Sequence, residues 1–444
     1  MRIAFLAMSG IRAWDQELLE MGLTMPGFVE RSQAIASLPS LGLLTLAGMS
    51  QAHDCSYHDL ENAQSITELD CQWDIAVISS FTAQIYEAYE VAAHCRKLGV
   101  KVIMGGLHVT SLPDEAQEHC DSIVIGEGES LWPQILKDYQ NKKEKSRYDA
   151  RPFSFDLKDA PMPAFELLDI EKYNRITIQT SRGCPHSCEF CAGSILLTSR
   201  YKQKPIDKVL AEIDAVLKIW PRPFIEFADD NSLVNKAYWQ KLLPELKKRK
   251  IRWFVETDIS LGQDPTFLKL LKDAGCTQVL IGLESPTDSG LDGLEERNNW
   301  KAKKIDSYHK NIKNIQAAGI RVNACFIIGL DGQDKTVFDA VYHFAEKASL
   351  FDIQVTLPTP FPGTPFYTRL KKEDRLLEEK AWHKTTLFDL LFTPDSMSYQ
   401  ELQQGFRTLI QKLYSDEFTK KRRSGYKALQ SQRAPKKLPT NSIR

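Results

Sequence analysis

The stretch Ser181-Arg-Gly-Cys-Pro-His-Ser-Cys-Glu-Phe-Cys-Ala-Gly193 holds three cysteines within eight residues, at C-x3-C-x2-C spacing. It directly follows a β-like run, Arg175-Ile-Thr-Ile-Gln-Thr180. A [4Fe–4S] cluster normally takes four cysteine ligands, so three closely spaced thiolates can hold three of its irons. Cys184, Cys188 and Cys191 therefore predict a cluster with one iron open to another molecule. An open iron can bind and reduce that molecule, whereas a fully ligated cluster mostly stores or passes electrons.

Two other interpretations of these cysteines are a zinc site and plain structural thiols. His186 lies between the cysteines, but zinc sites usually combine paired C-x2-C units, and the chain has no second pair. The chain has nine cysteines, an odd number and too few for a disulfide scaffold of this length. The remaining six are scattered, as ordinary buried thiols are: Cys55, Cys71, Cys95, Cys120, Cys276 and Cys325.

Length and composition predict a globular protein of two or three domains. The chain has 444 residues, of which 43% are hydrophobic and 26% charged, and its net charge of −1 gives no general attraction to nucleic acid or anionic lipid. No run reaches the roughly 18 apolar residues of a membrane span. The start, Met1 to Gly10, fits a first buried strand better than a signal peptide. We expect a cytoplasmic location, where reduced thiols and an oxygen-sensitive cluster persist.

Residues 1–138 alternate short apolar runs with helical stretches, the pattern of a doubly wound, Rossmann-like α/β domain. The expected parallel strands are 3–7, 75–78, 102–104 and 123–125. Loop-forming residues follow three of them, in Ser79-Ser-Phe-Thr82, Gly105-Gly-Leu-His108 and Gly126-Glu-Gly-Glu129. Ligands of such sheets bind beyond the carboxyl ends of the strands, so these loops are candidate ligand contacts, although tight turns would look the same.

A polar, proline-containing stretch predicts a linker at 139–169, and a second alternating series follows at 170–372. Its expected strands lie near 175–180, 223–228, 251–256, 278–283, 321–328 and 353–358. Six β/α units predict a partial (β/α)6 barrel with its active site at the carboxyl ends of the strands. Residues 373–419 look like a small helical region, and the basic segment 420–444 looks like a disordered tail.

The cysteine motif and the segments after each barrel strand resemble the radical S-adenosylmethionine (SAM) superfamily. In that superfamily the amino and carboxylate groups of SAM chelate the open iron, and one electron then cleaves the sulfonium to release a 5′-deoxyadenosyl radical. Asp229-Asp-Asn231 stands where the usual Gly-Gly-Glu is found, and Gly282-Leu-Glu-Ser285 and Phe326-Ile-Ile-Gly329 also fit the pattern. The resemblance implies SAM contacts at Phe190, Asp230, Glu256, Glu284 and Gly329.

The amino-terminal half resembles the cobalamin-binding domain fused to many radical SAM enzymes, in a subgroup similar to class B methyltransferases and magnesium-protoporphyrin cyclases. The resemblance rests on Pro39-Ser-Leu-Gly-Leu-Leu44 and the glycine-containing loops. It implies cobalamin contacts at Ser9, Ser79, Ser80, Gly105, Gly106, His108, Gly126, Glu127 and Gly128. The usual cobalt-ligating Asp-x-His-x-x-Gly motif is absent. Either cobalamin binds without a histidine ligand, or the domain has lost the cofactor.

These resemblances imply an enzyme that most often methylates an unactivated carbon of a small metabolite, lipid or natural-product intermediate. Oxidation, cyclisation or rearrangement, with or without cobalamin, is one alternative. A non-catalytic iron–sulfur redox protein is the other, and the open-iron spacing argues against it. The implied partners are a small-molecule substrate and an external one-electron donor, flavodoxin or ferredoxin. Trp382, His383 and Phe388 are candidate substrate contacts, although helix packing would explain them equally well.

Overall fold

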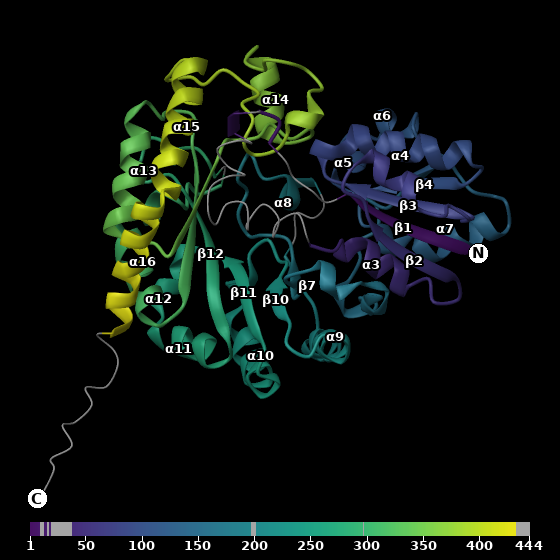
Figure 1. Cartoon of the computed structure of the whole chain (residues 1–444), viewed down its shortest axis with the longest axis horizontal. Helices are drawn as coiled ribbons and strands as arrows, with labels where there is room; N and C mark the ends of the chain where they lie inside the picture. The colour runs from purple at the N-terminus through teal and green to yellow at the C-terminus, as the bar shows by residue number, and fades with distance from the viewer. Residues whose placement is uncertain (9–12, 16, 19–37, 197–200, 296, 432–444) are drawn as a thin grey trace, which may run out of the picture.

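The computed structural model of the chain describes residues 1–8, 13–15, 17–18, 38–196, 201–295 and 297–431. Two six-stranded parallel sheets dominate it (Figure 1). Both are covered by helices, as expected for sheets whose strands are buried on both faces. Within the described residues, no helix is both long and apolar enough to cross a lipid bilayer.

The amino-terminal sheet has the strand order β2-β1-β3-β4-β5-β6. Its strands are β1 (Arg2–Met8), β2 (Asp54–Asp59), β3 (Ile75–Ser80), β4 (Lys101–Gly105), β5 (Ser122–Ile125) and β6 (Arg147–Asp149). Its helices are α3 (Leu41–Gly48), α4 (Ile85–Lys97), α5 (Leu107–Ser111), α6 (Pro113–Gln117) and α7 (Trp132–Gln140). The reversal of strand order beside β1 confirms the doubly wound prediction.

The sequence did not predict the two edge strands of this sheet. β2 has the sequence DCSYHD, and its partly exposed polar residues give no apolar run. β6 is only three residues long and lies inside the segment that we expected to be linker. Edge strands bury less side-chain surface than central strands, so their hydrophobic signal is weaker. The sheet therefore extends to Asp149, past the predicted boundary.

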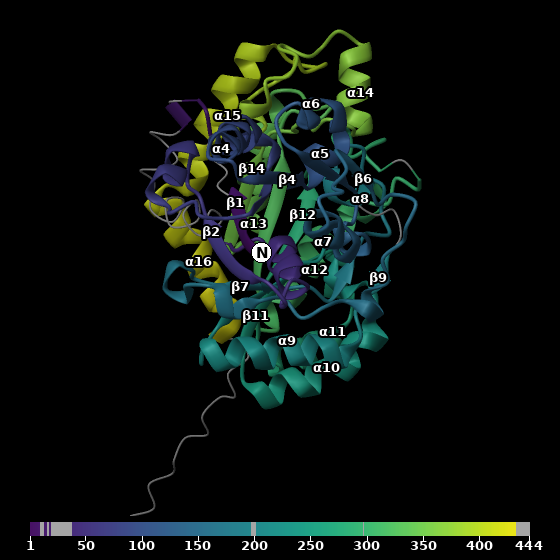
Figure 2. The same ribbon diagram turned by 90° about the vertical axis from the view of Figure 1, so that its right-hand side faces the viewer.

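The second sheet has the order β14-β13-β12-β11-β10-β7, forms the partial barrel that was predicted, and lies behind the amino-terminal domain in Figure 2. Its strands are β7 (Ile176–Ile178), β10 (Phe224–Phe227), β11 (Arg252–Thr257), β12 (Cys276–Glu284), β13 (Arg321–Ile327) and β14 (Asp352–Thr356). The helices of the barrel are α8 (Ala192–Leu196), α9 (Ile206–Ile219), α10 (Lys236–Arg249), α11 (Pro265–Asp273), α12 (Tyr308–Ala317) and α13 (Thr336–Lys347). A short antiparallel pair, β8 (Ser181–Arg182) and β9 (Lys202–Gln203), flanks the cysteine loop.

The carboxyl-terminal region differs from the prediction in two places. Much of the segment 373–398 is irregular. Helix α14 (Pro365–Lys372) precedes it, and helices α15 (Tyr399–Tyr414) and α16 (Asp416–Ser431) follow it. The prediction of disorder from residue 420 was wrong as far as residue 431. Arg422, almost fully buried, donates a hydrogen bond to the carbonyl of Leu350 at 2.8 Å, and Phe418 packs in the barrel core. The many basic residues of α16 masked its amphipathic pattern in the sequence. Residues 432–444 of the predicted tail lie outside the described part of the chain.

The carboxyl ends of the amino-terminal strands point toward the barrel (Figure 1). The loops that follow β4 and β5 consequently meet the cysteine loop and the segment 155–161 around one cavity. Parallel strands expose their carboxyl ends at a single edge, so each sheet contributes its ligand-binding edge to this interface.

Candidate active site

The cysteine loop leaves the barrel directly after β7. Cys188 is buried, whereas Cys184 and Cys191 are partly accessible. Burial, with a smaller contribution from neighbouring thiols of the loop, raises the pKa of Cys184 to about 11 and that of Cys188 to about 12. The three cysteines lie within eight residues of one loop, so their thiols share one region of the site. No three His, Cys, Asp or Glu side chains of the described residues surround a single ion. A [4Fe–4S] cluster binds each sulfur through a different iron, so it does not require three ligands around one ion.

Two neighbouring aspartates after β10 fix the start of this loop. Buried Asp229 accepts hydrogen bonds from the backbone N–H groups of Thr180 and Ser181 at 2.7 and 2.8 Å. Asp230 accepts one from the backbone N–H of Gly183 at 2.8 Å and remains exposed. Asp229 therefore has a structural role, while Asp230 presents a carboxylate beside the cysteines. This arrangement favours Asp230 for the predicted contact with the SAM amino group.

The loop that follows β12 supports the middle of the cysteine motif. Cys188 forms an antiparallel bridge with Glu295. The Glu295 carboxylate accepts hydrogen bonds from the N–H groups of Ser187 at 3.3 Å and Asn298 at 2.8 Å. These backbone donors hold the pKa of Glu295 below its usual range although burial opposes them. Because a carboxylate held by several N–H groups is rigid, Glu295 fixes the position of Cys188.

Lys301 is a partly buried cation beside the cluster loop that the sequence gave no means of finding. Its Nζ contacts the Glu284 carboxylate and donates to the carbonyl of Gly282 at 2.9 Å. Burial alone would lower the pKa of Lys301, but the charge of Glu284 outweighs it and raises the pKa. Glu284 has φ +63° at an irregularity between β12 and β13. Glu284, a predicted SAM contact, is thus already paired with Lys301 of the same chain.

The other predicted SAM contacts occupy different surroundings. Glu256 ends β11, and burial together with the nearby carboxylates Glu226, Asp230 and Asp229 raises its pKa to about 8. Phe190 is half-buried against the barrel core. Gly329 packs on α15, since a Cβ there would lie 2.6 Å from Leu402 Cδ2. Contact with SAM stays a prediction for each of these residues.

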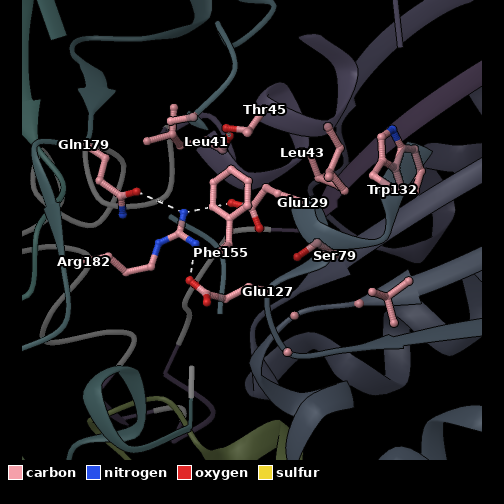
Figure 3. Close-up of a pocket in the computed structure, with 18 of the residues that line it drawn as sticks. Leu41, Leu43, Thr45, Ser79, Glu127, Glu129, Trp132, Phe155, Gln179 and Arg182 are labelled. Carbon is pink, nitrogen blue, oxygen red and sulfur yellow. Dashed lines mark hydrogen bonds and ion pairs between the residues drawn. The ribbon is translucent and has the colours of Figure 1, made fainter. Parts of the chain in front are cut away.

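A cavity of about 430 Å³ joins the amino-terminal sheet to the cysteine loop (Figure 3). Apolar side chains from α3, β3, β4, β5 and α7 line its inner end. Its outer end is polar and lies between the two sheets, with Arg182 held by two glutamates in Figure 3. The lining of the outer end includes Glu127, Glu129, Phe155, Gln179, Arg182, Gly193 and Asp230. One cavity therefore reaches both the glycine loops and Asp230.

Glycine geometry adapts this cavity to a large ligand. Gly126 has φ +84°, and a Cβ there would lie 3.3 Å from the backbone nitrogen of Arg151. Only glycine adopts this conformation without strain. Its N–H donates to Thr110 Oγ1 at 3.0 Å, so the turn after β5 is fixed before any ligand binds. The deep apolar end and the glycine-lined rim fit a bulky cofactor such as cobalamin, of which the cavity would enclose a part.

Most predicted cobalamin contacts line this cavity, namely Ser79, Gly105, Gly106, Gly126, Glu127 and Gly128. Ser80 and His108 do not belong to its lining. His108 is buried, with Nε2 3.3 Å from Glu115 Oε1, and the indole of Trp382 donates to the same oxygen at 3.0 Å. Ser9 lies outside the described residues. Among the described residues, no histidine lines the cavity, so none of them places an imidazole there to bind cobalt.

The candidate substrate contacts in the carboxyl-terminal region are only partly accessible. Trp382 is buried on the amino-terminal domain. His383 stacks edge-on with Trp14 at 4.7 Å, and Phe388 is half-buried against the barrel core. Their surroundings give Trp382 and Phe388 packing roles. A substrate contact stays a prediction for all three residues.

Comparison with known proteins identifies both halves of this site. Residues 178–345 match the radical SAM superfamily, and residues 34–136 match the B12-binding domain. Residues 364–443 match a domain of unknown function, DUF4070. The chain is 30% identical to bacteriochlorophyllide d C-8(2)-methyltransferase of Chlorobaculum tepidum, over 86% of this chain and 85% of that protein.

The chain belongs to the cobalamin-binding radical SAM enzymes.

The chain is also similar to a second curated relative and, in fold, to a solved structure. The anaerobic magnesium-protoporphyrin IX monomethyl ester cyclase of Cereibacter sphaeroides is 23% identical, over 84% of this chain and 65% of that protein. The cobalamin-dependent radical SAM enzyme OxsB, solved with aqua-cobalamin and SAM, shares the fold with a TM-score of 0.69 at 16% identity, covering 97% of this chain and 71% of that one. The predicted fold and cofactors, a [4Fe–4S] cluster, SAM and cobalamin, are confirmed.

Several residues of the site escaped the sequence reading. Arg182 and Lys202 are ordinary basic residues in sequence, and Phe155 lies in the expected linker. For Arg182 a usable signal was its place inside the cysteine motif, two residues before Cys184. Nothing comparable marks Lys202 or Phe155, because their roles depend on which segments the fold brings together.

Proposed function

We propose that this enzyme transfers a methyl group to an unactivated carbon of a small-molecule substrate. When bound, the cluster with SAM supplies a 5′-deoxyadenosyl radical and cobalamin supplies a transferable methyl group. The observation that carries the proposal is the single cavity lined both by the glycine loops and by Asp230 and Gly193 beside the cysteines. Methyl transfer requires the two cofactors to face one substrate, and a shared cavity meets that requirement.

The residues of the chain have separate tasks in this proposal. Cys184, Cys188 and Cys191 ligate the cluster, and Glu295 keeps their loop rigid through its hydrogen bonds to backbone N–H groups. Asp230 would receive the amino group of SAM. The apolar inner end of the cavity, with Trp132 and Val77, would exclude water from the buried part of cobalamin.

For the substrate and the electron donor, we propose only the chemical class of each. Relatives named for bacteriochlorophyllide and magnesium-protoporphyrin substrates support a polycyclic, largely apolar substrate. We expect a flavodoxin or a ferredoxin to deliver the single electron that the cluster requires. A reducing cytoplasm suits these partners, and no disulfide links any of the nine cysteines, all of which lie among the described residues.

A second candidate function is oxidation or cyclisation without methyl transfer. The related cyclase favours it, because that protein matches over 84% of this chain. The two candidates use the same cofactors, so only the product separates them.

The deciding experiment is product analysis with SAM that carries a deuterated methyl group. The protein would be reconstituted anaerobically with iron, sulfide and hydroxocobalamin, then reduced with dithionite in the presence of tetrapyrrole and polycyclic lipid fractions. We expect 5′-deoxyadenosine together with a product that gains the CD3 group. Formation of 5′-deoxyadenosine with an oxidised, unlabelled product would support the second candidate. Absence of 5′-deoxyadenosine would contradict both.

A further inference from the structure

Arg182 joins the cysteine loop to the cobalamin-binding domain. Its Nη1 donates to Glu127 Oε1 at 2.7 Å and its Nη2 to Glu129 Oε1 at 2.9 Å (Figure 3). The same Nη2 also donates to the side-chain oxygen of Gln179 at 3.1 Å. The two glutamates belong to the loop after β5 that lines the cavity, whereas Arg182 stands on β8, two residues before Cys184. A single guanidinium therefore spans the boundary between the two cofactor sites.

Lys202 strengthens this connection from the paired strand. Arg182 and Lys202 are partners in the register of β8 and β9. Lys202 Nζ donates to the second oxygen of Glu127 at 2.6 Å and to the carbonyl of Phe155 at 2.9 Å. The cysteine loop, the glycine loop and the segment bearing Phe155 thus meet at one carboxylate.

The network is buried and balanced in charge. The side chains of Glu127 and Glu129 are 7% and 11% exposed, and those of Arg182 and Lys202 are 18% and 14% exposed. Two cations face two carboxylates, so no charge is left without a partner of opposite sign. Burial alone would lower the pKa of Arg182, but the carboxylates outweigh it and raise the pKa. Because charged hydrogen bonds of this kind have strict directions, the network fixes geometry as well as energy.

We propose that Arg182 is a positioning residue that fixes the orientation of cobalamin relative to the cluster. The inference rests on the two-cofactor site of the proposed function and assigns one side chain to its alignment. The ion pairs of Arg182 connect two cofactor-binding segments. Glu127 and Glu129 line the rim of the cavity, and Arg182 lies two residues before the first cluster ligand, Cys184. Lysine could not replace it, because one ammonium group cannot form the two-pronged connection.

The test compares four forms of the holoenzyme: wild type, Arg182→Met, the double variant Arg182→Met with Glu129→Gln, and Arg249→Met. The double variant keeps the charges balanced, because Glu127 retains Lys202. Arg249 forms a comparable two-pronged pair with Asp214, at 2.7 Å for each bond, on helices α9 and α10, and it is absent from the cavity lining. It controls for the loss of an arginine pair elsewhere.

The primary measurement is the magnetic coupling between cob(II)alamin and the reduced cluster by electron paramagnetic resonance, which needs no substrate. We expect Arg182→Met and the double variant to show a broader distribution of this coupling than the wild type. We also expect their dissociation constants for hydroxocobalamin to rise about tenfold, the effect of losing one strong charged hydrogen bond. The double variant should regain the thermal stability that Arg182→Met loses. The Arg249→Met form should match the wild type in coupling and in cobalamin affinity.

Two results would overturn the positioning role. One is a wild-type coupling and dissociation constant in Arg182→Met. The other is a double variant that regains the wild-type coupling along with its stability, because charge balance alone would then explain the network. A wild-type protein that retains no cobalamin would contradict the proposed function itself, whereas the two results above leave that function intact.

Discussion

Glu189 and Arg369 form a two-pronged ion pair between the cysteine loop and α14, with Oε1–Nη2 and Oε2–Nε distances of 2.7 and 3.1 Å. Glu189 lies between Cys188 and Cys191, and Arg369 also pairs with Asp331 after β13. The cysteine loop is therefore held on the carboxyl-terminal side by Arg369, and Arg182 ties its start to Glu127 and Glu129 of the amino-terminal domain.

Substitution of Arg369 should shorten the lifetime of the cluster. The pair is partly exposed, so its loss should cost on the order of 1 kcal/mol, or about fivefold in the rate of cluster loss. The decay of the visible absorbance of the Arg369→Met holoenzyme under air would measure this rate, with Arg249→Met as the matched control. Equal decay in both variants would show that the pair does not restrain the loop.

Replacement of a cluster ligand should abolish the cluster without unfolding the protein. Cys188→Ala removes one of three thiolates, so iron content and 5′-deoxyadenosine formation should fall to background. The control is Cys276→Ala, which removes another buried thiol, at the start of β12. We expect that control to keep its iron and to lose only about 1 kcal/mol of stability through the small cavity. Survival of SAM cleavage in Cys188→Ala would refute the ligand assignment.

Loss of Lys301 should destabilise the barrel through the carboxylate that it leaves behind. Lys301→Met strands Glu284 in a buried site, which should cost about 3–5 kcal/mol of unfolding free energy. The double variant with Glu284→Gln should recover most of that loss, because no unpaired charge remains. Denaturant unfolding of the two variants and the wild type supplies the comparison. Equal destabilisation by the single and double changes would assign the cost to packing instead of charge.

The central strands and the cysteine site could be predicted from the sequence, because both leave local signals. Buried parallel strands such as β1 are continuous apolar runs, and the three cysteines are close neighbours in the chain. Edge strand β2 has no such run. The helix α16 was hidden by its basic residues, since the burial of Arg422 depends partly on the carbonyl group of Leu350, 72 positions earlier in the chain.

The same reasoning explains which site residues could not be predicted. Arg182 and Glu127 are 55 positions apart and come from different domains, so no local pattern links them. The Lys301–Glu284 pair depends on an irregular backbone at Glu284, which a sequence pattern does not reveal. Long-range electrostatic partners of this kind require the assembled fold.

Substitution of Gly126 should weaken cobalamin binding beyond its effect on stability. Gly126→Ala forces alanine to φ +84° and places its Cβ 3.3 Å from the backbone of Arg151 at the cavity rim. Gly99 also has a positive φ, +81°, but open space surrounds it and it is not in the cavity lining. Both alanine variants should lose about 1 kcal/mol of stability. Only Gly126→Ala should bind hydroxocobalamin less tightly in a spectroscopic titration; equal affinities would argue against this rim as a cofactor contact.

Glu256 should make the stability of the protein fall as the pH rises. Burial and the carboxylates Glu226, Asp230 and Asp229 raise its pKa from 4.5 to about 8, while Arg175 opposes them. A raised folded-state pKa means that the folded form holds the proton more tightly than the unfolded form. Its stabilising effect is therefore complete below pH 4.5 and is lost as the pH rises toward 8.

The variant Glu256→Gln should remove this pH dependence, because glutamine resembles the protonated acid and does not ionise. Between pH 5 and pH 8, a window set by the two pKa values, the unfolding free energy of the wild type should fall relative to the variant by up to about 1.4 kcal/mol per pH unit. Denaturant unfolding of both forms in the same cluster state would measure the difference, with exposed Glu68→Gln as the control. Parallel pH profiles for wild type and Glu256→Gln would show that Glu256 is already ionised in the folded protein, in which case its carboxylate is available to a cationic ligand at neutral pH.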